Sequence, residues 1–155
     1  MTNQKVERVD EIPLILHWLK VMRIAEIIDT IWDPHGNWQG LSYGKLAVLF
    51  ITYMIHTLNH RLSGMEKWVE KHKTVLEKTT GWKISDKDAT DDRLEIMTGD
   101  FGLDVEKGLE FQRLPSQHLI QAFELPTTIG RYDTTSVNVH HSKENDLLTF
   151  GLSLR

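Results

Sequence analysis

Asp133 is the residue whose type and position are best suited to chemistry. It lies in the run Gly-Arg-Tyr-Asp-Thr-Thr-Ser at residues 130–136. The surrounding stretch, residues 129–139, is rich in Thr, Val, Tyr and Ser and predicts a β-strand. Asp is disfavoured inside strands, so this carboxylate indicates either a solvated strand edge or an oxygen ligand held rigidly for a divalent cation. Both interpretations stay open on the residues alone, and the solvated edge is the more common case.

Other groups that could act as ligands are weaker candidates. The run His-Thr-Leu-Asn-His at residues 56–60 places two imidazoles one helical turn apart, which is the spacing of a zinc-binding helix. Thr57 occupies the position of the glutamate in that motif, and the chain has no Cys. We therefore expect a helix-end His and a polar core His rather than zinc ligands. His140 and His141 are expected to end a strand, and the acidic residues at 144 and 146 to be solvated in a loop.

Basic residues are concentrated between His60 and Lys83, where two Trp residues lie among them. The cations of this stretch are Arg61, Lys67, Lys71, Lys73, Lys78 and Lys83, against Glu66, Glu70 and Glu77. Such a face contacts phosphates or is simply solvated, and the solvated case is more common. The candidate DNA-binding residues are Arg61, Lys67, Lys71 and Lys73. The chain has 18 Lys+Arg and 22 Asp+Glu, a formal charge of −4, so any nucleic-acid surface must be local.

The composition is that of a globular chain. The 155 residues are 40% hydrophobic and 26% charged, with 10 Gly and 4 Pro, which suits one domain or one domain plus part of another. The stretch 46–55 is too short to span a bilayer, and residues 1–10 lack the apolar region of a secretory signal. No Walker or dinucleotide-binding glycine pattern is present. We expect a cytoplasmic protein with no membrane and no nucleotide cofactor.

Helical patterns fill the chain up to residue 125. Apolar residues recur every three or four positions over 12–31, predicting one helix or two short ones. Residues 32–40 predict a loop with Trp32 and Trp38 folded onto the helices. Ser42 is expected to cap an apolar central helix that runs to about Leu58.

Three more helical segments follow. Residues 63–66 (Ser-Gly-Met-Glu) match a capping box at the start of a helix that Gly81 ends. Residues 90–92 (Thr-Asp-Asp) predict a hydroxyl-capped helix ending at Gly99. Two helical pieces are then expected, with a break at Pro115.

The pattern changes after residue 126. Strands are expected at 129–139 and 147–152, joined into a β-hairpin. An isolated hairpin is marginal in water, so it either begins a larger sheet or packs on the helices as a small cap. The predicted fold is mainly α, with an N-terminal helical domain over 1–125 and a β-hairpin over 126–155.

Several of these strings together resemble insertion-sequence transposases of the DDE class. The run at 131–136 resembles their first catalytic strand, and four upstream strings resemble their N-terminal helical domain in the same order. The upstream strings are residues 9–14, 35–42, 59–62 with 68–70, and 91–94. The resemblance thus covers nearly the whole chain.

The resemblance implies that the hairpin begins an RNase H-like α/β domain. In such enzymes three carboxylates hold two divalent metals, Mg²⁺ or Mn²⁺, that activate water and then a 3′-hydroxyl for attack on DNA. Asp133 matches the first carboxylate, and its metal and catalytic roles are carried over from the family. Residues 152–155 depart from the family pattern, so we expect an interrupted reading frame and a fragment that is inactive and holds no cofactor alone.

Two other functions are compatible with the residues. The chain could be a stand-alone helical module that binds DNA or a protein, or a structural remnant without function. As part of a transposase its expected partner is DNA at the transposon ends, and it could form a homo-oligomer.

Overall fold

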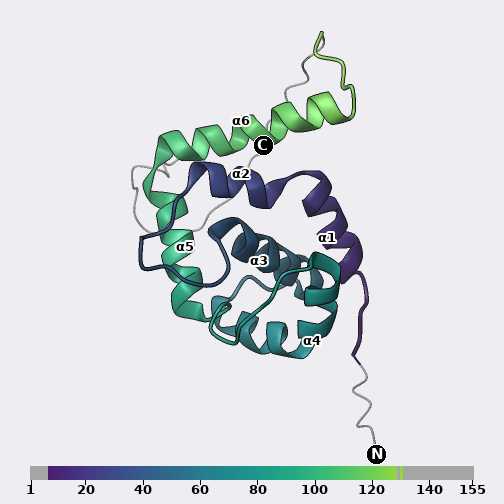
Figure 1. Ribbon diagram of the computed structural model, residues 1–155. Helices are drawn as coiled ribbons and strands as arrows, with labels where there is room; N and C mark the ends of the chain where they lie inside the picture. Colours follow the sequence, from purple (N-terminus) through teal and green to yellow (C-terminus); the bar gives the residue numbers. More distant parts are fainter. Residues whose placement is uncertain (1–6, 129, 131–155) are drawn as a thin grey trace, which may run out of the picture. The chain divides into compact units, whose positions relative to one another are not determined.

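The computed structural model describes residues 7–128 and Gly130 (Figure 1). The chain divides after Leu125 into two units, and all of the helices among the described residues lie in the first. They are α1 (Ile12–Val21), α2 (Ile24–Ile31), α3 (Tyr43–Thr57), the 3₁₀ helix η1 (Leu62–Gly64), α4 (Met65–Thr80), α5 (Asp91–Leu103) and α6 (Val105–Ala122). The described residues contain no strand, and the mainly α prediction is confirmed for them. The hairpin predicted at 129–152 lies outside the described residues.

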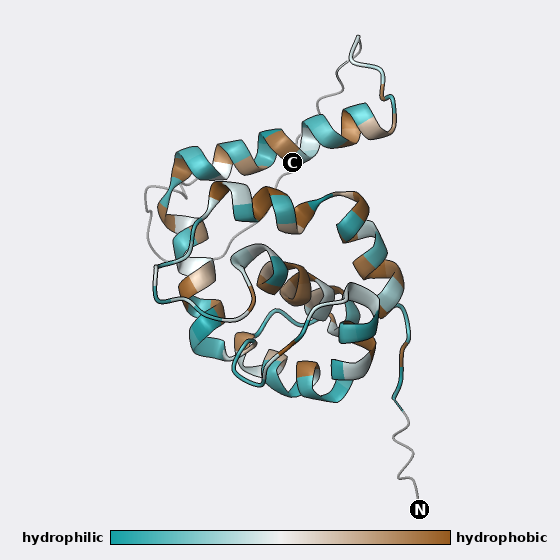
Figure 2. Ribbon diagram, in the orientation of Figure 1, coloured by the Kyte–Doolittle hydropathy of each residue, from teal (hydrophilic) through white to brown (hydrophobic). Residues whose placement is uncertain are grey.

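Helix α3 is the centre of the helical unit, and α1, α2 and α4 pack against it. Hydrophobic residues occur along most of its length (Figure 2). Leu46 and Leu49 are completely buried, and even the hydroxyl of Thr52 is buried and donates to the Val48 carbonyl. Burying a Leu side chain stabilises a fold by about 1.5–3 kcal/mol, so this helix supplies much of the core. The predicted central helix is confirmed.

Helices α1 and α2 are separated by a single sharp turn at Arg23. This residue has a left-handed backbone (φ 55°), and its N–H donates to the Lys20 carbonyl. The turn lets both helices bury their apolar faces against α3, through Leu16 and Leu19 of α1 and Ile28 of α2. Of the two arrangements predicted for residues 12–31, the structure has two short helices.

Helix α2 also fixes the start of α3. Asp29 accepts hydrogen bonds from the Ser42 hydroxyl (2.6 Å) and from the Gly44 N–H (2.6 Å). The predicted Ser42 cap is present as well, since its Oγ accepts from the Lys45 N–H. Asp29 and Ser42 thus satisfy orphan donors that every helix start leaves. The two backbones are so close that a Cβ on Gly44 would lie 2.0 Å from the Ala25 carbonyl oxygen.

The loop between α2 and α3 is folded onto the helices, as predicted from its Trp residues. Trp32 is buried, with its ring 4.6 Å from that of Phe101 in α5. Trp38 packs edge-on against Tyr43 and donates its indole N–H to the Leu41 carbonyl at 2.7 Å. The aromatic rings exclude water, and the Trp38 indole keeps a hydrogen-bond partner while that of Trp32 is buried without one among the described residues.

A buried carboxylate, Asp88, ties the same loop to the start of α5. Its Oδ1 accepts from the Leu41 N–H (3.0 Å) and from Arg93 (3.3 Å), and its Oδ2 accepts from the Ser85 N–H (2.8 Å). A charge that is only 1% exposed is tolerated because these donors replace its water. Gly40 is required beside it, because its φ is +90° and a Cβ there would lie 2.0 Å from Asp88 Oδ1.

Two predicted helix caps are wrong. Residues 62–64 already form η1, which continues into α4, so the capping box at Ser63 is absent. A cap residue needs an extended backbone, whereas Gly64, at the α4 start, is in the right-handed helical region. Thr90 does have the extended backbone at the start of α5, but its side chain makes no capping hydrogen bond. The predicted end of α4 at Gly81 is confirmed by a left-handed φ of 74°.

Two predicted helix breaks are also wrong. Helix α5 continues through Gly99 to Leu103, because Phe101 beyond it packs on Trp32 and this contact outweighs a glycine cost of about 1 kcal/mol. Helix α6 runs unbroken through Pro115. Proline leaves the Phe111 carbonyl without its helical partner, and α6 has no buried residue, so water can reach that turn.

Among the described helices, none combines the length and the hydropathy needed to cross a membrane.

Candidate functional site

The predicted catalytic residue, Asp133, lies outside the described residues, as do Glu144, Asp146 and the His140–His141 pair. The candidate residues that the structure does describe are His56 in α3, His60 and Arg61 between α3 and α4, and the lysines of α4.

The basic residues of α4 are divided between two faces of the helix. Lys67 and Lys71 lie one turn apart on an exposed face before the bend at His72, and Lys78 is exposed beyond it. They make no hydrogen bond or ion pair with any residue that the structure describes. The structure thus leaves the ammonium groups of Lys67 and Lys71 exposed on one face of α4.

Lys73, which the sequence grouped with these residues, lies on another face. Its ammonium donates to Asp86 at 2.9 Å, and this hydrogen bond holds the pKa of the Asp86 carboxyl below its usual value. Glu66 and Glu70 lie on that side too, around the same hollow as Lys73 and Asp86. Lys73 is therefore less available to a phosphate than its neighbours.

Arg61 lies before α4, just outside η1. It is exposed, and its backbone carbonyl accepts a hydrogen bond from the buried Tyr53 hydroxyl at 3.1 Å. This contact fixes the backbone of Arg61 while its guanidinium extends into solvent. Its position is compatible with the predicted contact to an anion.

The two histidines that were weighed as a zinc pair do not share a helix. Helix α3 ends at Thr57, and Leu58 has a left-handed backbone with φ 52°, so His60 lies beyond the helix and is exposed. His56 lies in the last turn, where its Nδ1 is 3.1 Å from Glu11 Oε1. The expected helix-end His is confirmed by His56, whereas the expected polar core His is wrong, because His60 is exposed.

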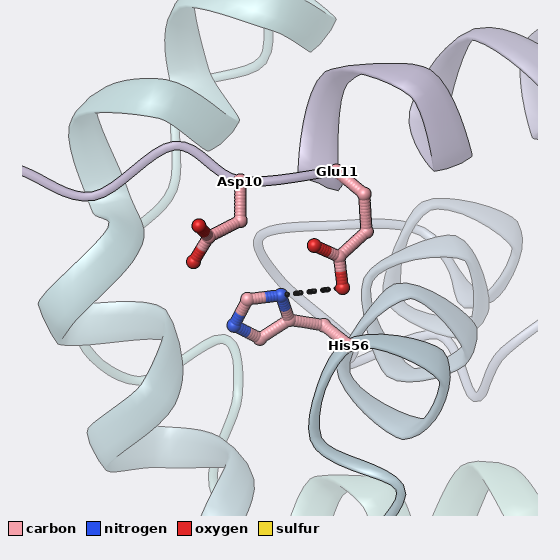
Figure 3. Close-up of side chains that lie close together, drawn as sticks. All are labelled: Asp10, Glu11 and His56. Atoms are coloured by element: carbon pink, nitrogen blue, oxygen red, sulfur yellow. Dashed lines mark hydrogen bonds and ion pairs between the residues drawn. The ribbon is translucent and has the colours of Figure 1, made fainter.

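Three side chains that can bind a metal converge at this point (Figure 3). One donor atom each of Asp10, Glu11 and His56 lies within 4.8 Å of the other two. Asp10 has a left-handed backbone (φ 43°), and its carboxylate also accepts from Arg8 at 2.8 Å. That hydrogen bond raises the pKa of Arg8. We call Asp10, Glu11 and His56 the carboxylate–histidine cluster.

The imidazole of His56 packs against two aromatic rings of α4. Its ring centroid is 5.3 Å from that of His72 and 5.8 Å from that of Trp68. His72 is 2% exposed and its Nδ1 is 2.8 Å from the Trp68 carbonyl oxygen. The His56 ring is thus packed on aromatic groups, with only 15% of its side chain exposed.

The same part of α4 is bent, and the bend binds the N-terminal segment. His72 has non-helical dihedral angles (φ −108°, ψ 15°) inside the helix. The N–H of Val75, one turn later, donates to Glu7 Oε1 at 3.1 Å. Glu7 and Glu11 therefore attach the segment before α1 to two helices, at α4 and at the end of α3.

The buried Tyr43 hydroxyl is a further polar group in the core. The Tyr43 hydroxyl donates to Asp100 Oδ2 at 2.5 Å. Burial of the phenol raises the pKa of Tyr43 above its usual value, and the hydrogen bond to Asp100 raises it further. This pair links α3 to α5.

Sequence reasoning missed the polar partnerships made over long distances in the chain. Asp88 lies 47 residues from Leu41, and Glu11 lies 45 residues from His56. No helical or strand period connects such residues. An acid next to a helix start is also ordinary in sequence terms, so Asp10 and Glu11 carry no distinguishing signal.

Comparisons with protein-family models, curated proteins and solved structures found no match to this chain.

Proposed function

We propose that the chain is the N-terminal helical domain, with the first catalytic strand, of a DDE-type transposase. In the full-length enzyme it would act in metal-dependent DNA cleavage and strand transfer. Asp133 would be one of the carboxylates that hold Mg²⁺ or Mn²⁺, in a domain of RNase H-like fold that the predicted hairpin would begin.

One contact in the helical unit supports this proposal. Two strings that resemble the transposase domain, residues 35–42 and 91–94, are far apart in sequence and pack on one another. Arg93 lies 4.0 Å from the centroid of the Trp38 ring and donates to the Gln39 carbonyl. Segments that belong to one domain are expected to pack together, and these two do.

The proposal is tested by the nucleotide sequence that follows codon 155. We expect codons for a second strand-borne Asp and a helix-borne Glu downstream in one of the three reading frames, with inverted repeats flanking the gene. If neither is found, the transposase proposal fails. The helical unit would then be better explained as a stand-alone binding module.

The 155-residue chain alone should not cut DNA, because Asp133 is the one residue matched to the carboxylate set. Supercoiled plasmid incubated with the chain and Mg²⁺ or Mn²⁺ should stay supercoiled. Nicking that disappears in Asp133→Ala would contradict this expectation.

The α4 face is the proposed DNA contact of the helical unit. Lys67 and Lys71 face solvent, and each phosphate contact releases about one counterion from the duplex. The double variant Lys67→Glu, Lys71→Glu should weaken duplex binding at least ~10-fold and reduce the salt slope by about 2. Fluorescence anisotropy at several salt concentrations measures both quantities.

Lys73→Glu is the matched control for this experiment. It changes the charge by the same amount per residue, but on the face where Lys73 is already paired with Asp86. Its effect on binding should be much smaller than that of Lys67→Glu alone. Equal losses in both single variants would show that the chain responds to net charge and has no specific DNA face.

A further inference from the structure

We propose that the carboxylate–histidine cluster binds one divalent transition-metal ion of the Zn²⁺ type. This site is separate from Asp133 and from the α4 lysines. It does not depend on the proposed transposase function.

The donor set suits such an ion. One imidazole nitrogen and two carboxylate oxygens are ligands that Zn²⁺ uses, whereas Mg²⁺ prefers oxygen alone. Around a tetrahedral ion with ligands at about 2.0–2.1 Å, neighbouring donor atoms are about 3.4 Å apart. His56 Nδ1 and Glu11 Oε1 are already 3.1 Å apart, and all three donors lie within 4.8 Å. Small rotations of the exposed Asp10 and Glu11 side chains would close the remaining gap.

The histidine of the set is fixed in place before any ion binds. His56 packs on Trp68 and His72, so its ring loses little freedom on coordination. It also lies in the last turn of α3, where the unpaired carbonyls of the helix end favour a cation. The start of α1, at Glu11, carries a partial positive charge that disfavours a cation. The carboxylates of Asp10 and Glu11 offset this charge.

Arg8 is the cation that an incoming metal must displace. Its guanidinium lies 2.8 Å from Asp10, and its side chain is 80% exposed. Exposed ion pairs of this kind contribute little, so the exchange costs little. The ion would then connect the start of α1 to the end of α3, two points 45 residues apart in the chain.

Calorimetric titration of ZnCl₂ into the EDTA-treated, tag-free 155-residue chain tests the proposal. We expect saturable binding of one ion per chain and a rise in the thermal unfolding temperature, because the ligands come together only in the folded state. His56→Gln should weaken the binding more than ~10-fold, since removal of even a supporting residue can cost that much.

His60→Gln is the matched control, because His60 is exposed and lies outside the cluster. It should bind Zn²⁺ like the unchanged chain. If His56→Gln does not fold, Glu11→Gln and Asp10→Asn alter only exposed groups and should show the same loss. Absence of saturable binding would overturn the proposal. So would binding that survives in the cluster variants, or binding that His60→Gln lowers equally.

Discussion

At the scale of single residues, Asp88 has the most consequential environment. It is a carboxylate with almost no contact with water, and its donors come from Leu41, Ser85 and Arg93. Leu41 is buried and Arg93 is half-buried. Removing the carboxylate would leave a guanidinium and two backbone N–H groups without their partner, and buried groups in that state are costly.

Asp88→Ala should therefore destabilise the fold by about 3–5 kcal/mol, the range for breaking a buried ion pair by removing one partner. Urea unfolding followed by circular dichroism measures the change. Asp86→Ala, two positions away, is the control, because Asp86 is exposed and solvent screens its pair with Lys73, so the loss should be much smaller. Similar losses of unfolding free energy in the two variants would show that the hydrogen bonds of Asp88 do not hold the loop in place.

Only some of the hydrogen bonds made by single residues could be predicted from the sequence. The Ser42 cap follows from a residue and its neighbours three positions on, so it could be predicted, and it is present. The Asp88 and Glu11 contacts depend on the tertiary arrangement and could not. One histidine of the 56–60 pair was expected to end a helix, and His56 does so, but its partner Glu11 was not foreseen.

At the scale of helices, the contact between α2 and α3 depends on one missing side chain. Gly44 lies where the α3 backbone meets Ala25, and a Cβ there would be 2.0 Å from a carbonyl oxygen that cannot move independently of its helix. Helices α2 and α3 would have to move apart, and apolar contacts around Ile28 and Leu46 would then be lost.

Gly44→Ala should destabilise the protein by about 1–3 kcal/mol, the usual cost of overpacking a core, despite the better helix propensity of Ala. Gly99→Ala is the matched control inside α5. Nothing lies within 4 Å of a Cβ at that position, so the same change should stabilise by up to about 1 kcal/mol. Thermal unfolding of both variants gives the comparison, and a gain in stability for Gly44→Ala would refute the close-contact explanation.

Helix positions were predicted better than helix ends. Apolar periodicity predicted the central helix and a helical segment over residues 12–31, because burial against neighbours determines both, but it left open whether that segment is one helix or two. Gly99 and Pro115 were expected to end helices, yet α5 and α6 pass through them. The contact of Phe101 with Trp32 cannot be read from local propensity, and this contact explains why α5 continues.

At the scale of the whole molecule, the hydrophobic core of the described residues lies entirely between Ile12 and Met97. Helix α6 adds half-buried contacts such as Phe111 on Trp32. The helical unit thus has a core of its own within residues 7–125.

A chain ending at residue 125 should therefore unfold with the same midpoint as the 155-residue chain, within about 2 °C. Thermal unfolding followed at 222 nm measures this, and matched helical signal per molecule is the control for correct folding. A much lower midpoint for the shorter chain would show that residues 126–155 support the helical unit.

The contact of Asp88 with Leu41 also sets an order of events during synthesis on the ribosome. The loop with Trp32 and Trp38 emerges first, and its anchors at Asp88 and Arg93 follow about 50 residues later. At roughly 5–20 residues per second this interval is about 3–10 s. During it the two indoles have no partner from α5, so nascent chains of this length are the ones that a chaperone should bind most readily.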